Sequence, residues 1–242
     1  MKPHHVPVMT VVFSLVLLFG TKHVPAETIR FGYIEFPPYT YTDDQGKPAG
    51  ILVDLANKII PHAGYEPEFF SFPVRRLASY IGSGDLDVWM GLKTLPEFEG
   101  KTYIGSTVVA ELILRAYFKG KKNPIRVKEE MIGKSIIVLR GYSYGGWTSF
   151  IEDPKNTINH IKANTHEAAF NMLKADRAEY VLDYKEPSDM ALRKITIPNL
   201  SHNQISALPC YIVVSRANPN GRAILENLEK SYHILKEQGT LD

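Results

Sequence analysis

The chain has 242 residues, 44% of them hydrophobic, and its 28 Lys and Arg against 26 Asp and Glu give a formal net charge of +2. A charge this well balanced gives no electrostatic basis for binding nucleic acid or an anionic membrane surface. The single cysteine, Cys210, excludes an intrachain disulfide, a multi-cysteine metal site and CxxC redox chemistry, and its apolar neighbours indicate a small buried hydrophobe.

The N-terminus has the layout of a secretory signal. Lys2 gives a basic start, residues 11–19 (VVFSLVLLF) are apolar, and residues 24–26 (VPA) suit cleavage after Ala26. The apolar run is shorter than the ~20 residues that a membrane-spanning helix needs, although a buried strand or a membrane anchor is the alternative. We therefore expect a signal peptide over 1–26 and a periplasmic mature chain that starts near Glu27. Cleavage removes two lysines and no acid, which brings the formal net charge from +2 to zero.

The rest of the chain alternates predicted strands and helices. Its first half predicts a strand over 28–33, a turn over 43–46, a helix over 51–62, a strand over 68–72, a helix over 75–81 and a strand over 86–90. Beyond 122–124 the pattern resumes, with strands over 135–139 and 179–182 and helices over 127–131, 144–151, 165–175 and 222–235. This alternation predicts an α/β fold with mostly parallel sheet.

Two extended apolar segments, 112–118 and 207–215, bracket everything between them. They suit two strands that cross between two lobes, with the second lobe inserted into the first. We expect lobe 1 to comprise 27–116 and 208–242, and lobe 2 to comprise 117–207.

Six short segments resemble, in order, family 3 of the bacterial extracellular solute-binding proteins, the polar-amino-acid receptors of ABC transporters. They are 29–39, which ends in PPY; 46–55 (GKPAGILVDL); Arg76 with 83–87 (SGDLD); 132–134 (IGK) with 138–143 (VLRGYS); 178–183 (AEYVLD); and 226–240, which ends in LKEQGT. No single segment is specific, but their order over nearly the whole mature chain is a strong signal.

The resemblance implies the two-lobed Venus-flytrap fold of periplasmic binding proteins, with mixed or parallel sheets and two crossover strands between the lobes. It implies a small polar ligand, an amino acid or an amine-like solute, that is held between the lobes and delivered to an inner-membrane ABC permease. Sensing through a membrane partner is the alternative. We expect a monomer without metal, cofactor or catalytic activity.

The resemblance also implies positions for the ligand. Phe36 matches an aromatic residue that stacks on the ligand, and Tyr33 and Glu35 flank it. Asp183 matches the second-lobe Asp that pairs with the α-amino group. Ser143, between a predicted strand and a predicted helix, matches a residue whose backbone N–H binds the ligand carboxylate.

One departure changes the expected ligand. Amino-acid binders of the family carry a T-P-E-R run whose Arg binds the α-carboxylate in a bidentate fork, whereas residues 92–98 (LKTLPEF) place Glu97 or Phe98 there. The candidates to replace that Arg are Lys93, Arg76 and Arg140, and a lysine is not a fork. An amine, a modified amino acid or an aromatic solute becomes the favoured ligand. The expected ligand-binding set is Tyr33, Glu35, Phe36, Arg76, Gly91, Lys93, Arg140, Ser143 and Asp183.

Two enzymatic alternatives stay open at this point. Residues 141–145 (GYSYG) satisfy the G-x-S-x-G pattern of a serine hydrolase, with Asp183 and either His202 or His233 following in hydrolase order. No His-Gly-Gly segment for an oxyanion hole occurs upstream. A dehydratase of this fold would use Glu35 or Glu97 as its acid and base.

Overall fold

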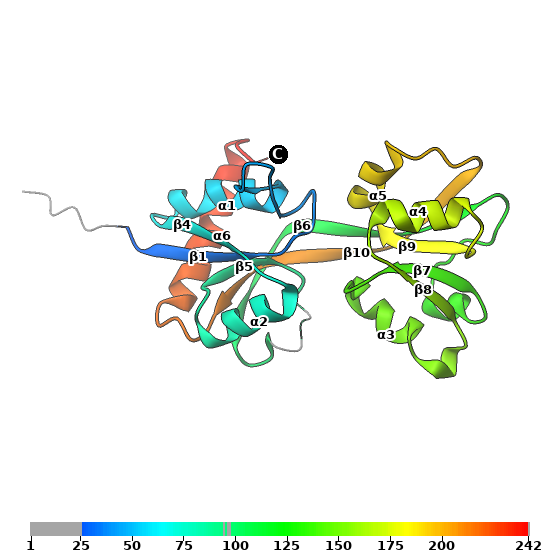
Figure 1. Ribbon diagram of the computed structural model, residues 1–242. Coiled ribbons are helices and arrows are strands. Elements are labelled where there is room, and N and C mark those ends of the chain that lie inside the picture. The colour runs from blue at the N-terminus through cyan, green and yellow to red at the C-terminus, as the bar shows by residue number, and fades with distance from the viewer. Residues whose placement is uncertain (1–25, 94, 96–97, 242) are drawn as a thin grey trace, which may run out of the picture.

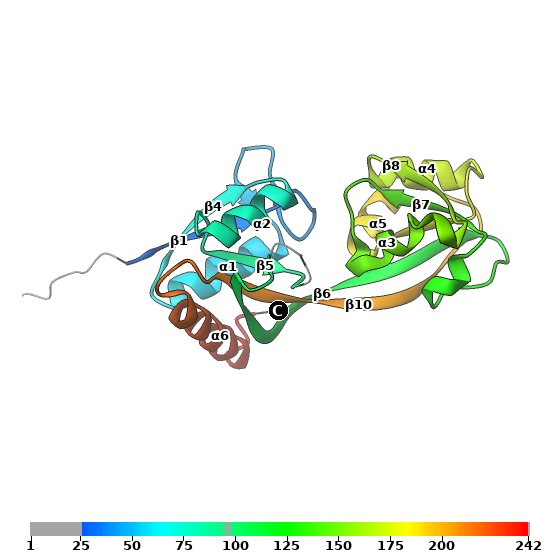
Figure 2. The same ribbon diagram turned by 90° about the horizontal axis from the view of Figure 1, so that it is seen from below.

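The computed structural model describes residues 26–93, 95 and 98–241. They form two lobes joined by two long strands, β6 (Thr102–Lys119) and β10 (Leu200–Ser215), as Figures 1 and 2 show. The first lobe contains β1 (Thr28–Tyr33), β4 (Glu66–Ser71), β5 (Val88–Gly91), α1 (Ile51–His62), α2 (Val74–Ser83) and α6 (Gly221–Glu237). The second contains β7 (Ser135–Leu139), β8 (Asn159–Ala163), β9 (Tyr180–Tyr184), α3 (Trp147–Ile151), α4 (His166–Lys174) and α5 (Lys185–Leu192).

One eight-stranded sheet runs through both lobes in the order β4-β1-β5-β10-β6-β9-β7-β8. Its outer parts are parallel, since β1 pairs with β4 and β5, and β7 pairs with β8 and β9. The central pairings of β10 with β5 and β6, and of β6 with β9, are antiparallel. A short hairpin of β2 (Tyr41–Thr42) and β3 (Pro48–Ala49) lies apart from this sheet. The two-lobed fold and mixed sheet expected from the sequence are therefore confirmed.

Helices cover both faces of the sheet in the first lobe. Helices α1 and α6 contribute Ile59, Ile60, Ile224 and Leu228 to the main core, whereas α2 packs Leu77 and Ile81 into a separate smaller cluster. In the second lobe α4 and α5 lie over one face, and α3 lies over the other (Figure 1). No helix in the described part of the chain combines the length and apolar character needed to cross a bilayer.

Several predicted elements differ from the structure. The segment 127–131 forms only a 3₁₀ turn, η2 (Lys128–Met131), and the helix predicted over 144–151 begins at Trp147, after a 3₁₀ turn η3 (Tyr144–Gly146). Strand β6 begins ten residues before the predicted segment, because four of its first ten residues are exposed and interrupt the apolar pattern. Elements β8 and α5 were not predicted.

The predicted lobe boundaries fall inside two strands of the structure, and the predicted signal peptide lies outside the residues that the structure describes. Residues 116 and 207 lie within β6 and β10, which run unbroken through both lobes. Residues 1–25, which carry the predicted signal, lie outside the described residues.

An ion pair between Arg30 and Asp87 connects β1 to the start of β5 in the first lobe. Asp87, directly before β5, is almost completely buried and accepts hydrogen bonds from the Arg30 backbone N–H (2.9 Å), Arg30 Nε (2.8 Å), Arg30 Nη2 (2.8 Å) and Asn218 Nδ2 (2.8 Å). These contacts tie β1 and the segment after β10 to β5. Burial raises the pKa of Asp87, but the bonds from Arg30 and Asn218 outweigh burial, and the net pKa lies below its ordinary value.

We expect Asp87→Ala to lower the free energy of unfolding by about 3 kcal/mol, because it leaves the Arg30 and Asn218 donors without their acceptor. Urea denaturation measures the loss, and Asp85→Ala at a neighbouring exposed carboxylate should change stability by less than about 0.5 kcal/mol.

The same contact gives a pH dependence with a defined sign. A lowered folded-state pKa means that the stabilisation is present above the unfolded pKa of about 3.9 and is lost as the pH falls through the folded pKa. The difference in stability between wild type and Asp87→Ala should therefore shrink below about pH 4. A difference that stays constant down to pH 2 would contradict this assignment.

Candidate functional site

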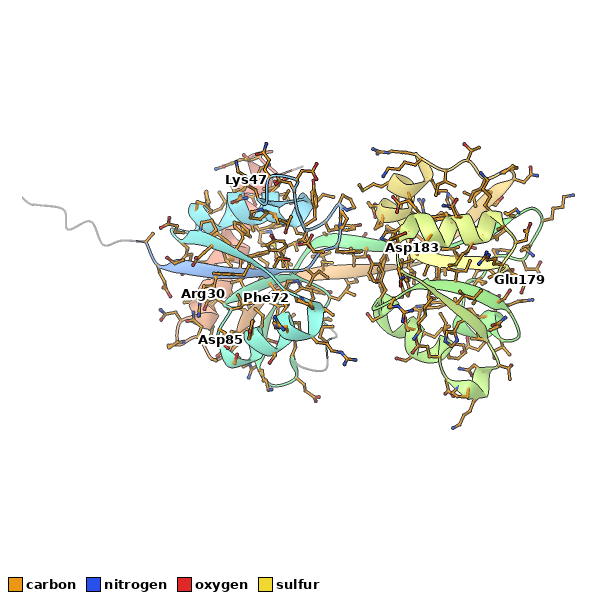
Figure 3. The ribbon with its side chains drawn as sticks, in the orientation of Figure 1. Arg30, Lys47, Phe72, Asp85, Glu179 and Asp183 are labelled. Atoms are coloured by element: carbon orange, nitrogen blue, oxygen red, sulfur yellow. The ribbon has the colours of Figure 1, made fainter. Side chains whose placement is uncertain are left out.

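A cavity of ≈ 410 Å³ lies between the two lobes. This volume is within the ~300–1,000 Å³ that is usual for small-molecule sites. The first lobe lines it with side chains that include Glu35, Phe36, Tyr39, Phe72 and Trp89, and the second lobe lines it with Arg140, Gly141, Tyr142, Ser143 and Tyr184. Figure 3 labels Phe72 in the first lobe and Asp183 at the end of the second lobe that faces it.

Aromatic rings bring the lobes into contact at the cavity. The Phe36 ring stacks on the Tyr39 ring at 5.2 Å between centroids. It also forms edge-to-face pairs with two second-lobe rings, Tyr142 at 5.4 Å and Tyr184 at 5.5 Å. Edge-to-face pairs at these distances are favourable for aromatic rings. Phe36 is thus a first-lobe ring that directly contacts the second-lobe wall.

A polar contact also joins the lobes at this point. The Tyr39 hydroxyl donates to Glu186 Oε2 at 2.5 Å, at the start of α5, and lies 3.3 Å from the carbonyl oxygen of Glu111. Burial, followed by the bond to Glu186, raises the pKa of Tyr39 far above its ordinary value. Tyr39 therefore stays a neutral hydrogen-bond donor between the lobes.

Among the described lining residues, the first-lobe wall carries one carboxylate, Glu35. Its oxygens accept bonds from Ser71 Oγ (2.7 Å), Thr42 Oγ1 (2.7 Å) and the Thr42 backbone N–H (2.9 Å). Burial raises the pKa of Glu35, but these three bonds outweigh burial and the net pKa is below its ordinary value. Glu35 is consequently a fixed negative charge at neutral pH.

The second-lobe wall carries one cation, Arg140, which follows the last residue of β7. Its Nε donates to Asn164 Oδ1 at 3.1 Å, which leaves the rest of the guanidinium exposed. Among the described lining residues, Glu35 and Arg140 are the ones with a full charge, and they belong to opposite lobes.

Asp183 ends up away from the cavity surface. It is completely buried, its Oδ2 lies 2.6 Å from His166 Nδ1, and its Oδ1 accepts the backbone N–H of Tyr184 at 2.8 Å. Burial raises the pKa of Asp183, although the bond from His166 acts in the opposite direction. The partner that faces this carboxyl group is thus a side chain of the protein, His166.

The structure divides the nine residues expected to bind ligand into two groups. Five line the cavity: Glu35, Phe36, Gly91, Arg140 and Ser143. Four are not among the lining residues: Tyr33 bonds to Thr42 Oγ1, Arg76 is exposed on α2, Lys93 Nζ lies 4.7 Å from the centre of the Tyr211 ring, and Asp183 bonds to His166.

The position of the missing Arg also has a structural account. Glu97 lies outside the described residues. Phe98 is buried with its ring 5.3 Å from Trp89, inside the α2 cluster. Its side chain fills core at a position where the resemblance would place a fork for a carboxylate.

The loop around Ser143 differs from a helix N-terminus. Gly141, Tyr144, Gly145 and Gly146 all have positive φ, and the backbone N–H groups of Gly146 and Thr148 already donate to the Ser143 carbonyl. The backbone N–H groups here do not form the aligned set expected of a long helix.

The hydrolase arrangement is not assembled among the described residues. His202 packs its ring against Tyr117, and His233 bonds to Thr107 Oγ1 on the first lobe. His166, the histidine that does meet Asp183, directs its Nε2 to the Tyr142 hydroxyl at 3.2 Å. Ser143 therefore has no histidine as general base in this part of the structure.

Sequence reasoning missed most of the aromatic lining. Tyr142 and Tyr184 stand directly beside Ser143 and Asp183, so the motif positions could have directed attention to them. Cys210 also lines the cavity, as a buried residue whose pKa is raised to about 12 by burial. This confirms its interpretation as a small buried hydrophobe.

Comparison with known proteins now adds to this geometry. A sequence profile of the bacterial extracellular solute-binding proteins, family 3, matches residues 29–242. The chain is 26% identical over 113 residues to the L-cystine-binding protein TcyJ of Escherichia coli (strain K12), which covers 46% of this chain and 42% of that protein. The match thus spans less than half the length of that curated relative.

Solved structures share the fold over most of the chain. A histidine kinase sensor domain with similarity to periplasmic binding proteins has a TM-score of 0.70 and 20% identity, over 89% of this chain and 93% of its own. The probable amino-acid ABC transporter extracellular-binding protein ytmK from Bacillus subtilis has a TM-score of 0.70 and 19% identity, over 90% and 96%. At this identity the likeness concerns the fold.

We expect Tyr39→Phe to shift the chain toward more open forms, because it removes the bond to Glu186 and keeps the ring that stacks on Phe36. Small-angle scattering of the ligand-free protein should show a larger radius of gyration than wild type. Tyr41→Phe, on β2 and outside the cavity lining, is the matched control. An unchanged radius in Tyr39→Phe would mean that this bond does not hold the lobes together.

Proposed function

The chain belongs to the bacterial extracellular solute-binding proteins, family 3, and from this premise we propose that it captures one small polar solute between its lobes in the periplasm. The bound solute is delivered to an inner-membrane ABC permease, and the protein itself catalyses nothing. The observation that carries the proposal is the cavity between the lobes, with its aromatic walls and two opposite charges.

The walls of the cavity favour a solute with an apolar or aromatic body. Phe36, Phe72 and Trp89 offer ring faces, and ring faces attract both apolar groups and ammonium cations. We propose that Glu35 receives a cationic group of the solute and that Arg140 receives an anionic or carbonyl group. An amine or an amino acid with a large side chain meets both conditions.

Closure couples the two walls. The charges lie on different lobes, so a solute that contacts both is bound more tightly when the lobes approach. Binding energy of this kind shifts a hinge equilibrium toward the closed form. The strands β6 and β10 are the segments that must bend, since they join the lobes.

The predicted residues that do not line the cavity have indirect roles in this proposal. Tyr33 fixes the Thr42 hydroxyl that in turn bonds to Glu35, so it acts on the ligand through the carboxylate. Arg76 and Lys93 stay candidates for the rim of the closed form. Asp183 acts from behind the cavity wall, through His166 and Tyr142.

Sensing is the second candidate function, and it uses the same closure. The likeness to a histidine kinase sensor domain concerns the fold that both functions share. Capture of solute is common to both, so it is tested first.

A thermal-shift screen of the mature protein tests the proposal. The panel contains L-cystine, L-arginine, L-glutamine, tyramine and their deaminated or decarboxylated analogues. A true ligand at a hundred times its Kd stabilises the folded state by about 2.7 kcal/mol, which raises the melting temperature by roughly 5–10 °C for a chain of this size. A panel of amines and amino acids that leaves the melting temperature unchanged would contradict the proposed ligand class.

Charge-neutralising variants assign the two ends of the solute. Glu35→Gln should weaken binding of an amine-bearing ligand about tenfold, and Arg140→Gln should weaken binding of a carboxylate-bearing ligand by a similar factor, since each removes one charge-assisted contact. Isothermal titration calorimetry measures both. Asp54→Asn on α1 and Lys174→Gln on α4, both exposed and outside the lining, are the matched controls. Equal losses in variants and controls would contradict the assignment.

A further inference from the structure

Three side chains form a hydrogen-bonded row behind the cavity wall. Asp183 Oδ2 lies 2.6 Å from His166 Nδ1, and His166 Nε2 lies 3.2 Å from the Tyr142 hydroxyl. Tyr142 is the member that lines the cavity, whereas Asp183 is completely buried. The row therefore connects a buried carboxyl group to a side chain of the cavity wall.

The fold fixes all three residues. Asp183 lies on β9, where its second oxygen is held by the Tyr184 backbone N–H. His166 is the first residue of α4, whose N-cap Thr165 accepts a bond from the Ala168 backbone N–H at 3.0 Å. The Tyr142 ring packs against Phe36 and the other tyrosines of the wall. None of the three side chains is free to turn away from its partner.

The direction of the bond to Tyr142 follows from counting protons. A carboxylate only accepts, so when the Asp183–His166 pair holds one proton, that proton lies on Nδ1 and Nε2 is a lone pair. Tyr142 then donates to Nε2, and its oxygen lone pairs face the cavity. When the pair holds two protons, Nε2 carries a hydrogen and donates to Tyr142, whose own hydrogen is free to point at the ligand.

This outcome does not depend on which atom of the pair holds the second proton. A protonated Asp183 bonded to a neutral imidazole and an ionised Asp183 bonded to an imidazolium both leave a hydrogen on Nε2. Two groups this close titrate as a unit, so the number of protons on the pair is the relevant quantity.

We propose that the Asp183–His166 pair sets the hydrogen-bond polarity of the Tyr142 hydroxyl, which presents an acceptor to the solute when the pair holds one proton and a donor when it holds two. The proposal rests on the proposed function and makes Tyr142 a specificity-determining residue of that site. Asp183 and His166 are its positioning residues. In the one-proton state the site selects ammonium or N–H groups; in the two-proton state it selects carboxylate or carbonyl groups.

The groups around the Asp183–His166 pair are side chains of the protein. The titratable or charged groups that face it are Tyr142, Tyr144, Tyr184, Glu167 on α4, and Lys194, which lies 3.4 Å from Glu167. Burial, and then the charge of Asp183, raises the pKa of Tyr142 well above its ordinary value. Tyr142 therefore keeps its own proton, and the pair alone decides where that proton points.

Nitrogen NMR of the ligand-free mature protein, labelled with ¹⁵N-histidine, tests the polarity without any ligand. When the pair holds one proton, we expect that proton on Nδ1 of His166 and a bare Nε2, and we expect the second proton to appear on Nε2. His166→Gln identifies the resonances by their loss, and Tyr142→Phe identifies them by a shift even if the first variant does not fold. A pair that holds one proton and carries it on Nε2 would overturn the proposal.

Binding of two probes with the same ring tests the consequence for specificity. Tyramine ends in an ammonium group and 3-(4-hydroxyphenyl)propionate ends in a carboxylate. At pH 8 Tyr142→Phe should weaken tyramine about tenfold and leave the propionate within twofold, since a bond to a charged donor is lost only for tyramine. Tyr41→Phe is the control with a hydroxyl removed outside the lining.

The possible outcomes separate the two proposals. Equal weakening of both probes in Tyr142→Phe, or unchanged tyramine affinity, would overturn the assignment of Tyr142 as an acceptor. If wild type binds neither probe, the thermal-shift screen decides the ligand class, and the NMR result alone decides the polarity of Tyr142.

Discussion

The antiparallel pairing of β6 with β10 is the constraint on which the other features depend. These two strands are the only segments of the described chain that run through both lobes, and their register is interrupted near Gln204, at Cys210 and at Tyr211. Such irregularities bend and twist a ribbon locally. Because two of them fall beside the cavity, which Cys210 lines, the ribbon is most easily bent where a ligand would lie.

The two ends of this ribbon are held differently. In the first lobe Asp87 connects β5, β1 and the segment after β10 through bonds that a buried carboxylate requires. In the second lobe β9 pairs with β6 and carries Asp183 one residue before its end, and the partners of Asp183 belong to the same lobe. Each lobe thus satisfies its own buried charge. Among the described residues, aromatic rings and the Tyr39–Glu186 bond join the lobes at the cavity.

Elements that are determined by a pattern within one short segment could be predicted from the sequence, whereas elements that depend on contacts between distant segments could not. Helix Ile51–His62 and strand Ser135–Leu139 have the predicted bounds, because periodicity within each segment determines them. Helix α5 was missed because Pro187 reads as a helix breaker, yet it stands in the first turn, where proline is tolerated. Strand β8 was missed because a polar edge strand shows little apolar pattern.

The site was harder to predict because its side chains meet through the packing of separate helices and strands. The family resemblance pointed to Phe36 and Ser143, and Gly91 and Arg140 were also among the predicted residues; all four line the cavity. They could not show that His166, 17 residues before Asp183, supplies the partner for that carboxylate, since their meeting depends on how α4 packs beside β9.

A buried pair of this kind has a consequence that an exposed carboxylate does not have. An Asp at the cavity surface attracts any cation, and water competes for it, whereas a completely buried Asp183 must keep its partner and is costly to expose. Its influence reaches the cavity only as the orientation of one hydroxyl hydrogen on Tyr142. A hydroxyl discriminates by direction as well as by charge, so the second lobe can select the hydrogen-bonding group of a solute without a full charge at the surface of its wall beside Tyr142. The full charges of the site, Glu35 and Arg140, are then free to set affinity, while Tyr142 decides which polar group is accepted beside them.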